Sequence, residues 1–309
     1  MIKWKRCTEM PVSWFRPQVV VGDHKVYVGG GVTEDQNMFT ILEYDPYNDV
    51  WIIHSPSRVV LYGLSYFQGK LITIGGSNID GFVGNVSSYN RLNKNWEDKI
   101  PPMPTGRCTL TVICTDEAIV ACGGAVLDGN LNPVPCQSVE VYISDTSQWH
   151  TSACLPHPYA ATSFTVIGDH CFLVGEAAES GGGRRVICAK MMDLTEHKIA
   201  AASSSSSSPQ VWKELSASPL VGSAAVTFNG ALLTLGGDDS DGDTVNHVYA
   251  FMPKTSSWVR LHHGALPEAR GGSSAVQLPD GRVVIVGGNG PDSDKTASVF
   301  IGTVHCLLQ

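Results

Sequence analysis

A glycine doublet that ends a short apolar run recurs along the chain and constrains the possible folds more than any other feature. Five copies are intact, and a sixth, Val174-Gly175-Glu176, has lost its second glycine. The first glycines of successive copies are separated by 46, 48, 52, 61 and 51 residues. A period near 50 predicts one structural unit per copy. The intact copies are Val28-Gly29-Gly30, Ile74-Gly75-Gly76, Cys122-Gly123-Gly124, Leu235-Gly236-Gly237 and Val286-Gly287-Gly288.

Other residues recur in step with the doublet. A tight-turn pair such as Asn229-Gly230 or Asp280-Gly281 precedes each copy and predicts a hairpin, because both central residues of a type I′ turn need positive φ. A tryptophan follows five copies, at Trp51, Trp96, Trp149, Trp212 and Trp258. Four of these have an aromatic residue seven positions earlier, at Tyr44, Tyr89, Tyr142 and Phe251. Each unit therefore predicts four strands, which in the third unit span 109–114, 118–122, 138–143 and 149–153.

The doublet followed by tyrosine and tryptophan resembles the kelch repeat, and the resemblance covers essentially the whole chain. It implies an all-β, six-bladed β-propeller with four antiparallel strands per blade, in a single domain over residues 1–309. Elementary physics agrees with this fold. A small antiparallel sheet cannot bury both of its faces alone, so blades stack around an axis and cover one another.

The last repeat lacks residues for an outermost strand, because 22 residues follow its first glycine, Gly287. The segment around Trp4 precedes the first blade and has no strands of its own to complete. We therefore expect residues 2–7 to supply the outermost strand of the sixth blade, which removes an exposed sheet edge. The alternative is a strand that starts at Leu307.

Because antiparallel strands alternate in direction, the loops between first and second strands and between third and fourth strands lie on one face of a propeller. The loops between second and third strands, and those between blades, lie on the other face. The loops between second and third strands, such as 125–137 and 238–246, are long and varied, as recognition loops are. Around the channel mouth on this face we predict a ligand site with two arginines, which suit carboxylates, and rigid aromatic contacts. The kelch resemblance implies contacts from these residues and from polar residues after the doublets. The predicted residues are Trp14, Tyr62, Arg107, Tyr159, Arg270, Ser77, Asn78, Asp238, Asp239 and Asn289. The competing interpretation is that each arginine pairs structurally with a neighbouring blade.

The predicted function is non-enzymatic binding of a protein or peptide segment, with an acidic or phosphorylated loop as the expected ligand. The kelch resemblance implies a substrate-recognition role in a cullin-based ubiquitin ligase adaptor, through an upstream BTB domain. One alternative is an actin-binding or scaffold propeller that uses its outer blade edges. Another is a kelch-type enzyme, either a copper oxidase or a sugar-modifying protein.

Catalytic and metal signatures are weak. The sequence has no Gly-x-Ser-x-Gly elbow, no phosphate-binding glycine loop and no His-x-His spacing, so we expect no catalysis and no cofactor. The run Asp238 to Asp243 begins like a calcium loop. An EF-hand, however, needs glycine and glutamate where this chain has Thr244 and Ala250. We therefore interpret the run as turn chemistry.

Charge and cysteine usage set the expected surroundings. With 21 Lys plus Arg against 29 Asp plus Glu, the net charge is -8, which disfavours nucleic acid and anionic membranes as partners. The sequence lacks a long apolar run and a secretion signal, and its 9 cysteines form no Cys-x-x-Cys pair. We expect a cytoplasmic protein with reduced thiols. Six serines, 203–208, predict a loop on the face opposite the ligand site.

Overall fold

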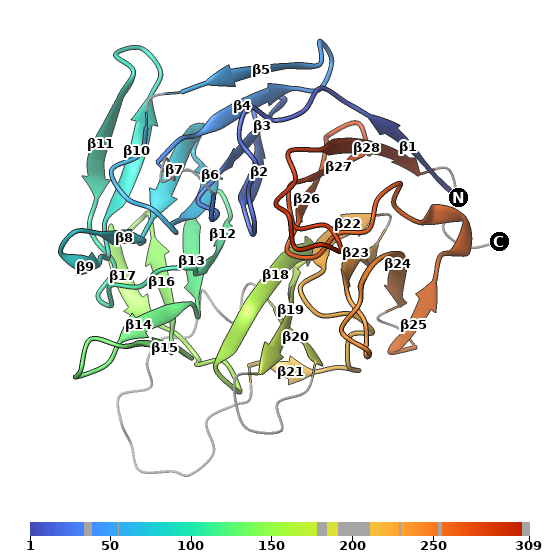
Figure 1. The fold of residues 1–309 in the computed structure, drawn as a ribbon. Helices are drawn as coiled ribbons and strands as arrows, with labels where there is room; N and C mark the ends of the chain where they lie inside the picture. The colour runs from blue at the N-terminus through green and yellow to red at the C-terminus, as the bar shows by residue number, and fades with distance from the viewer. Residues whose placement is uncertain are drawn as a thin grey trace.

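Six four-stranded antiparallel sheets form a closed ring in the computed structural model (Figure 1). The structure describes residues 1–33, 39–54, 56–177, 184–190, 211–228, 230–252 and 255–304. The predicted six-bladed, all-β propeller is confirmed. The serine run and Leu307 lie outside the described residues. No helix in the described part of the chain is long and apolar enough to span a bilayer.

Each blade runs from the channel outward through strands a, b, c and d. The first blade comprises β2 (Gln18–Gly22), β3 (Lys25–Gly29), β4 (Leu42–Asp45) and β5 (Val50–Ile53). The second comprises β6 (Gly63–Phe67), β7 (Lys70–Ile74), β10 (Val86–Asn90) and β11 (Asn95–Ile100). The third comprises β12 (Thr111–Cys114), β13 (Ala118–Cys122), β16 (Val139–Ile143) and β17 (Gln148–Thr151).

The remaining blades follow the same order. The fourth comprises β18 (Tyr159–Ile167), β19 (His170–Ala177), β20 (Arg184–Lys190) and β21 (Lys213–Glu214). The fifth comprises β22 (Ala224–Phe228), β23 (Ala231–Asp238), β24 (Thr244–Met252) and β25 (Ser257–Arg260). The sixth comprises β26 (Ser274–Gln277), β27 (Val283–Val286), β28 (Val299–Val304) and β1 (Ile2–Arg6).

The N-terminal strand closes the ring, as predicted. β1 pairs antiparallel with β28, and Trp4 lies opposite Gly302. The indole of Trp4 also donates to the carbonyl of Gly264 at 3.0 Å, which joins the sixth blade to the fifth. β1 thus occupies the outer position that the alternative assigned to Leu307, and it covers the edge of β28.

The doublet glycines join neighbouring blades. Gly236 has φ 61, and a Cβ there would lie 2.3 Å from the carbonyl oxygen of Arg270 in the next blade. The amide of Gly237 donates to that same oxygen at 2.7 Å. The equivalent amide of Gly76 donates to the Arg107 carbonyl at 2.8 Å. Glycine is therefore required because the backbones of adjacent blades approach closely and φ is positive.

The register of the first doublet differs from the prediction by one residue. Val32 bridges Phe15, as Ser77 bridges Val60 in the second blade. The glycines that match Gly75-Gly76 are therefore Gly30-Gly31 rather than Gly29-Gly30. A run of three glycines hides the register in the sequence, and only the strand pairing reveals it.

The repeated aromatic residues lie between blades. Tyr142 and Trp149 of the third blade contact each other in a tilted arrangement, with ring centroids 5.7 Å apart. Both pack against Phe67 and Ile74 of the second blade in one apolar cluster. The indole of Trp149 donates to the Pro101 carbonyl at 2.7 Å, which satisfies its polar group. Such clusters bury the blade faces that a single sheet would expose.

Candidate ligand-binding site

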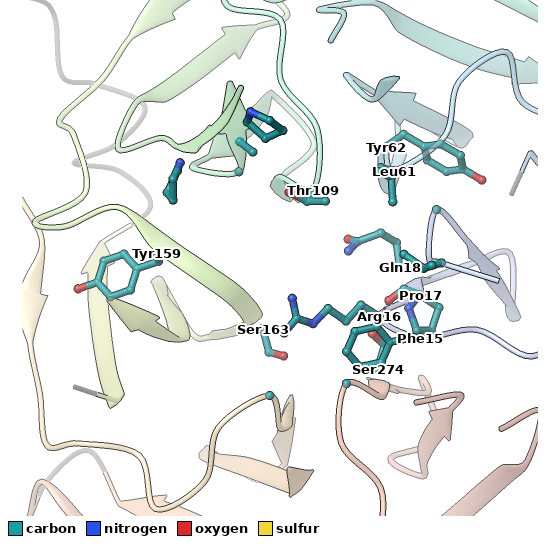
Figure 2. A pocket seen from close by; sticks show the side chains of 18 of the residues that line it. Phe15, Arg16, Pro17, Gln18, Leu61, Tyr62, Thr109, Tyr159, Ser163 and Ser274 are labelled. Carbon is teal, nitrogen blue, oxygen red and sulfur yellow. Dashed lines mark hydrogen bonds between the residues drawn. The ribbon is translucent and has the colours of Figure 1, made fainter. Parts of the chain in front are cut away.

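A cavity of about 360 Å³ opens at the channel mouth, on the face that carries the long loops between strands b and c. Figure 2 shows its lining side chains converging from several blades. One wall is the hairpin of β14 (Ala125–Leu127) and β15 (Pro133–Pro135), which belongs to the third blade. Apolar lining residues include Phe15, Val32, Leu61 and Val134. The cavity therefore offers a mainly apolar concave surface, as ligand sites generally do.

Left-handed residues ring the mouth just before strand a of each of five blades. Arg16, Leu61 and Thr109 have φ values of 51, 54 and 51, and Gly222 and Gly272 have 60 and 61. Backbone hydrogen bonds link neighbouring members of this set: Arg16 N donates to Gly272 O at 2.7 Å, and Thr109 N donates to Leu61 O at 2.8 Å. All five line the cavity. Positive φ costs energy for a non-glycine residue, and here it fixes three side chains at the mouth.

Arg16 is the cation of this cavity. Its side chain extends across the mouth toward Ser163 (Figure 2), and its guanidinium carbon lies 4.9 Å from the ring centroid of Phe15. Desolvation lowers its pKa, while Asp238 and Glu176 act in the opposite direction. The guanidinium forms no hydrogen bond or ion pair with any residue that the structure describes. Because arginine remains protonated, its donors are available to an anion.

Serine side chains provide polar groups deeper in the mouth. The hydroxyl of Ser163 donates to the Ser223 carbonyl at 2.6 Å, and that of Ser274 donates to the Pro17 carbonyl. Ser273 is 4% exposed, and its hydroxyl has no hydrogen-bond partner among the described residues. A buried hydroxyl without a partner is costly. Because the Ser273 oxygen is closed off from the open space of the cavity, it belongs to the cavity wall.

Arg107 does not face the channel mouth, which corrects the sequence prediction. It is fully buried, and its Nη2 lies 2.6 Å from Oε2 of Glu140. Its Nη1 donates to the carbonyls of Gly123 at 3.2 Å and Ser138 at 2.9 Å. The guanidinium therefore organises the doublet of its own blade. The arginine therefore forms a structural pair, as the competing interpretation of the sequence expected, but its partner Glu140 lies in the same blade and not in a neighbouring one.

Arg270 repeats this arrangement in the sixth blade and corrects the second arginine prediction. It is 1% exposed, and its Nη1 donates to the carbonyls of Gly287 and Ser298, each at 3.3 Å. Its Nη2 lies 3.0 Å from Oε2 of Glu268. Burial lowers the pKa of Arg270 to about 10, and Glu268 opposes that shift. Neither predicted arginine is thus available to a ligand at the mouth.

The predicted aromatic residues are buried. Trp14 is completely buried and packs with Val28 and Val286 between the first and sixth blades. Tyr62 and Tyr159 line the cavity, but they are 1% and 3% exposed and contribute to its walls. The expectation that Trp14 projects into the mouth is therefore wrong, because this position in the repeat points into the core between blades.

The polar residues predicted after the doublets support the loops around the mouth. Ser77, Asp238 and Asn289 form isolated backbone bridges to Val60, Val221 and Gly271 respectively, and Asn289 also bridges Lys295. Asn78 is exposed in the short hairpin of β8 (Ser77–Asn78) and β9 (Gly81–Phe82). None of these four predicted residues lines the described cavity, and their contact with a ligand stays a prediction.

The acidic run after the fifth doublet is a turn. Oδ1 of Asp239 accepts from the amides of Asp241 at 2.9 Å and Asp243 at 3.1 Å. Oδ1 of Asp238 accepts from the hydroxyl of Thr244 at 2.8 Å. Within the described ranges, no group of three His, Cys, Asp or Glu side chains is placed to hold a metal ion. The carboxylate of Asp239 thus caps its own loop, as the turn interpretation expects.

Arg16 was recognised in the sequence beside Trp14, at the entry to the first blade, but it is not among the predicted ligand residues. It lies two residues after buried Trp14, as Leu61 follows Val59 and Thr109 follows Arg107. A charge at a position that holds leucine, threonine or glycine in other blades was the available signal. This signal identifies a ligand residue only if the position two residues earlier, that of Trp14, is known to be buried.

Comparison with known proteins gives the same fold. The Kelch motif family model matches residues 219–261, which span the fifth blade. Beta-scruin of Limulus polyphemus is 23% identical over 183 residues, covering 56% of this chain and 20% of that protein. Kelch-like protein 15 of Mus musculus is 25% identical over 197 residues, covering 58% of this chain and 32% of that protein. This chain is a kelch-repeat β-propeller.

The kelch propeller also matches solved folds. The structure of YjhT superposes with a TM-score of 0.73 over 95% of each chain, at 14% sequence identity. This likeness concerns the fold alone. The kelch propeller spans at most about a third of the two curated relatives described above.

Proposed function

We propose that this kelch propeller is a non-enzymatic protein-interaction module that binds a peptide segment with an acidic side chain at its channel mouth. The observation that carries the proposal is the guanidinium of Arg16, which lies in a mainly apolar cavity without a partner among the described residues. A carboxylate or phosphate would complete its hydrogen bonds in a bidentate geometry.

The dimensions of the cavity favour a short turn or loop over a large ligand. About 360 Å³ accommodates a few side chains, and the apolar walls at Leu61 and Val134 suit aliphatic or aromatic groups beside the acid. Backbone hydrogen bonds between neighbouring blades at the mouth keep the site preformed, which lowers the entropic cost of binding.

A substrate-recognition role in a cullin-based ubiquitin ligase adaptor extends this proposal and rests on the kelch resemblance alone. In that role the mouth would select the protein to be modified, and another domain would contact the ligase. Cytoplasmic location fits the same role.

Selection from a random-peptide display library tests the proposal. The immobilised wild-type kelch propeller is the bait, and Arg16→Ala is the counter-selection bait. We expect enriched peptides that share an Asp, Glu or phosphate-mimicking residue next to apolar residues. Enrichment that is equal on both baits, or enriched peptides without an acid, would contradict the proposal.

A further inference from the structure

The outer strand of the first blade, β5 (Val50–Ile53), exposes apolar side chains along a sheet edge. It is the last strand of its sheet and pairs with β4 on its inner side. Val50, Ile52 and Ile53 are 47%, 51% and 63% exposed. Unpaired backbone groups on an apolar edge form a template for another strand.

The other five outer strands show how the propeller normally protects such edges. Strand pairing aligns Ile52 and Ile53 with the two residues that follow the repeat tryptophan in every blade. The aligned pairs are Glu97-Asp98, His150-Thr151, Lys213-Glu214, Val259-Arg260 and Lys5-Arg6. Each of these pairs contains an ionisable side chain, which discourages edge pairing. The first blade has two isoleucines in their place.

We propose that β5 is a homotypic interface, at which two copies of this kelch propeller pair antiparallel about a twofold axis. β5 has no charged side chain, so it offers no charge complementarity to a strand of a different protein. A second β5 presents the same apolar row, so neither copy buries an unpaired charge. Any other described outer strand placed against β5 would bury an ionisable group. The pairing joins the two sheets into one and covers Val50, Ile52 and Ile53.

Backbone geometry restricts the register of this pairing. The amide of His54 donates inward to the Ile41 carbonyl at 2.9 Å, so the backbone groups of Ile52 also face β4. Those of Trp51 and Ile53 therefore face outward. Antiparallel strands pair outward-facing residues with each other. The register that pairs both of these residues within β5 places Trp51 opposite Ile53 of the second copy and Ile52 opposite its own counterpart. The two Ile52 Cα atoms would lie about 4.5 Å apart, as in a pair without mutual hydrogen bonds.

Disulfide trapping tests this register. Cys154 is an exposed free cysteine, so Ile52→Cys is made in a Cys154→Ser background. Val259→Cys in the same background is the matched control, because Val259 occupies the position of Ile52 in the fifth blade and is 37% exposed. Diamide serves as oxidant and accepts the two electrons and two protons that the thiols release. We expect Ile52→Cys to form a linked dimer about tenfold faster than the control, since its Cα separation suits a disulfide.

Sedimentation of unlinked protein completes the test. We expect the wild-type mass to rise from one chain toward two across about a hundredfold range of concentration, as for an interface of less than standard size. Ile52→Lys should stay at the mass of one chain with an unchanged melting temperature, whereas Val259→Lys should behave like wild type. A wild-type mass of one chain throughout, an Ile52→Lys dimer, or equal trapping of the two cysteine variants would overturn the proposal.

Discussion

Arg107 and Glu140 form an ion pair inside the third blade, with 2.6 Å between Nη2 and Oε2 and with 0% and 4% of their side chains exposed. The other guanidinium nitrogen binds the carbonyls of Gly123 and Ser138. One buried cation therefore connects the start of the blade, the glycine doublet and strand β16. Such a pair is tolerated because each charge has a close partner.

Removal of Arg107 should destabilise the propeller strongly. Arg107→Ala leaves the Glu140 carboxylate buried without its cation, so we expect the free energy of unfolding to fall by about 3–5 kcal/mol in chemical denaturation. The double variant Arg107→Met with Glu140→Leu removes both charges and should recover most of that loss. Equal stabilities of Arg107→Ala and wild type would show that the pair contributes nothing to the fold.

Ring closure by β1 should also be visible in stability. Deleting residues 1–6 removes buried Ile2 and the indole of Trp4 and exposes the edge of β28. We expect a loss of about 3–5 kcal/mol and a greater tendency to aggregate. Lys3→Ala, which changes an exposed side chain of the same strand, is the control. A deletion variant that melts like wild type would mean that the ring is stable while open.

The sequence predicted the blade count, the four-strand pattern and the closing strand, because these depend on local features that recur. Glycine doublets, turn pairs and the tryptophan at each outer strand carry that information in every blade. The site was predicted less well. Arg107 and Arg270 are of a residue type that ligand sites use, but at their position in the repeat the side chain points into the blade. Arg16 lies two residues beyond a buried position, and this offset depends on backbone conformation at positive φ.

The doublet glycines should differ sharply from loop glycines in their tolerance of a side chain. Gly242 has φ 84 with nothing within 4 Å of an added Cβ, so Gly242→Ala should cost only about 1 kcal/mol of conformational strain. Gly236→Ala adds a clash with the Arg270 carbonyl and should cost about 3 kcal/mol or more. Melting temperatures of the two variants provide the comparison. Similar losses would indicate that the blades separate readily to admit the methyl group.

Stability should depend on pH through Asp45. Its carboxylate accepts from Lys25 Nζ at 2.6 Å, Asn48 Nδ2 at 2.7 Å and the Tyr47 amide at 2.9 Å. These hydrogen bonds, that of Lys25 foremost, hold the pKa of Asp45 well below its usual value. The stabilisation is complete above the unfolded pKa of about 3.9 and is lost as pH falls toward the folded pKa.

The corresponding variant is Asp45→Asn. It should be less stable than wild type at neutral pH, and the difference should shrink as pH falls from about 5 to about 2. Urea unfolding at several pH values measures this difference, with Asp80→Asn in an exposed loop as the control. A difference that stays constant with pH would exclude Asp45 as the titrating group.

Substitution of Arg16 should weaken ligand binding without lowering the stability of the fold. For an enriched acidic peptide, Arg16→Ala should weaken binding by about 1.5–3 kcal/mol, as for hydrogen bonds to a charged group, and leave the melting temperature nearly unchanged. Arg16→Lys keeps the charge but loses the bidentate fork, so its affinity should lie between the two. Arg91→Ala is the control, because Arg91 lies on the opposite face, in the turn between strands c and d of the second blade. There it pairs with Asp23 of the first blade at 2.7 Å. Calorimetric titration of the three variants measures these affinities.

A crystal structure of the kelch propeller with an enriched acidic peptide would show where the ligand binds and which side chains hold it. We expect the acidic group within hydrogen-bond distance of the Arg16 guanidinium, with neighbouring apolar side chains against Leu61 and Val134. Arg107 and Arg270 should keep their pairs with Glu140 and Glu268. A peptide bound on the outer blade edges, on the opposite face, or at the mouth without contact to Arg16 would show that Arg16 does not bind the acidic group of the ligand.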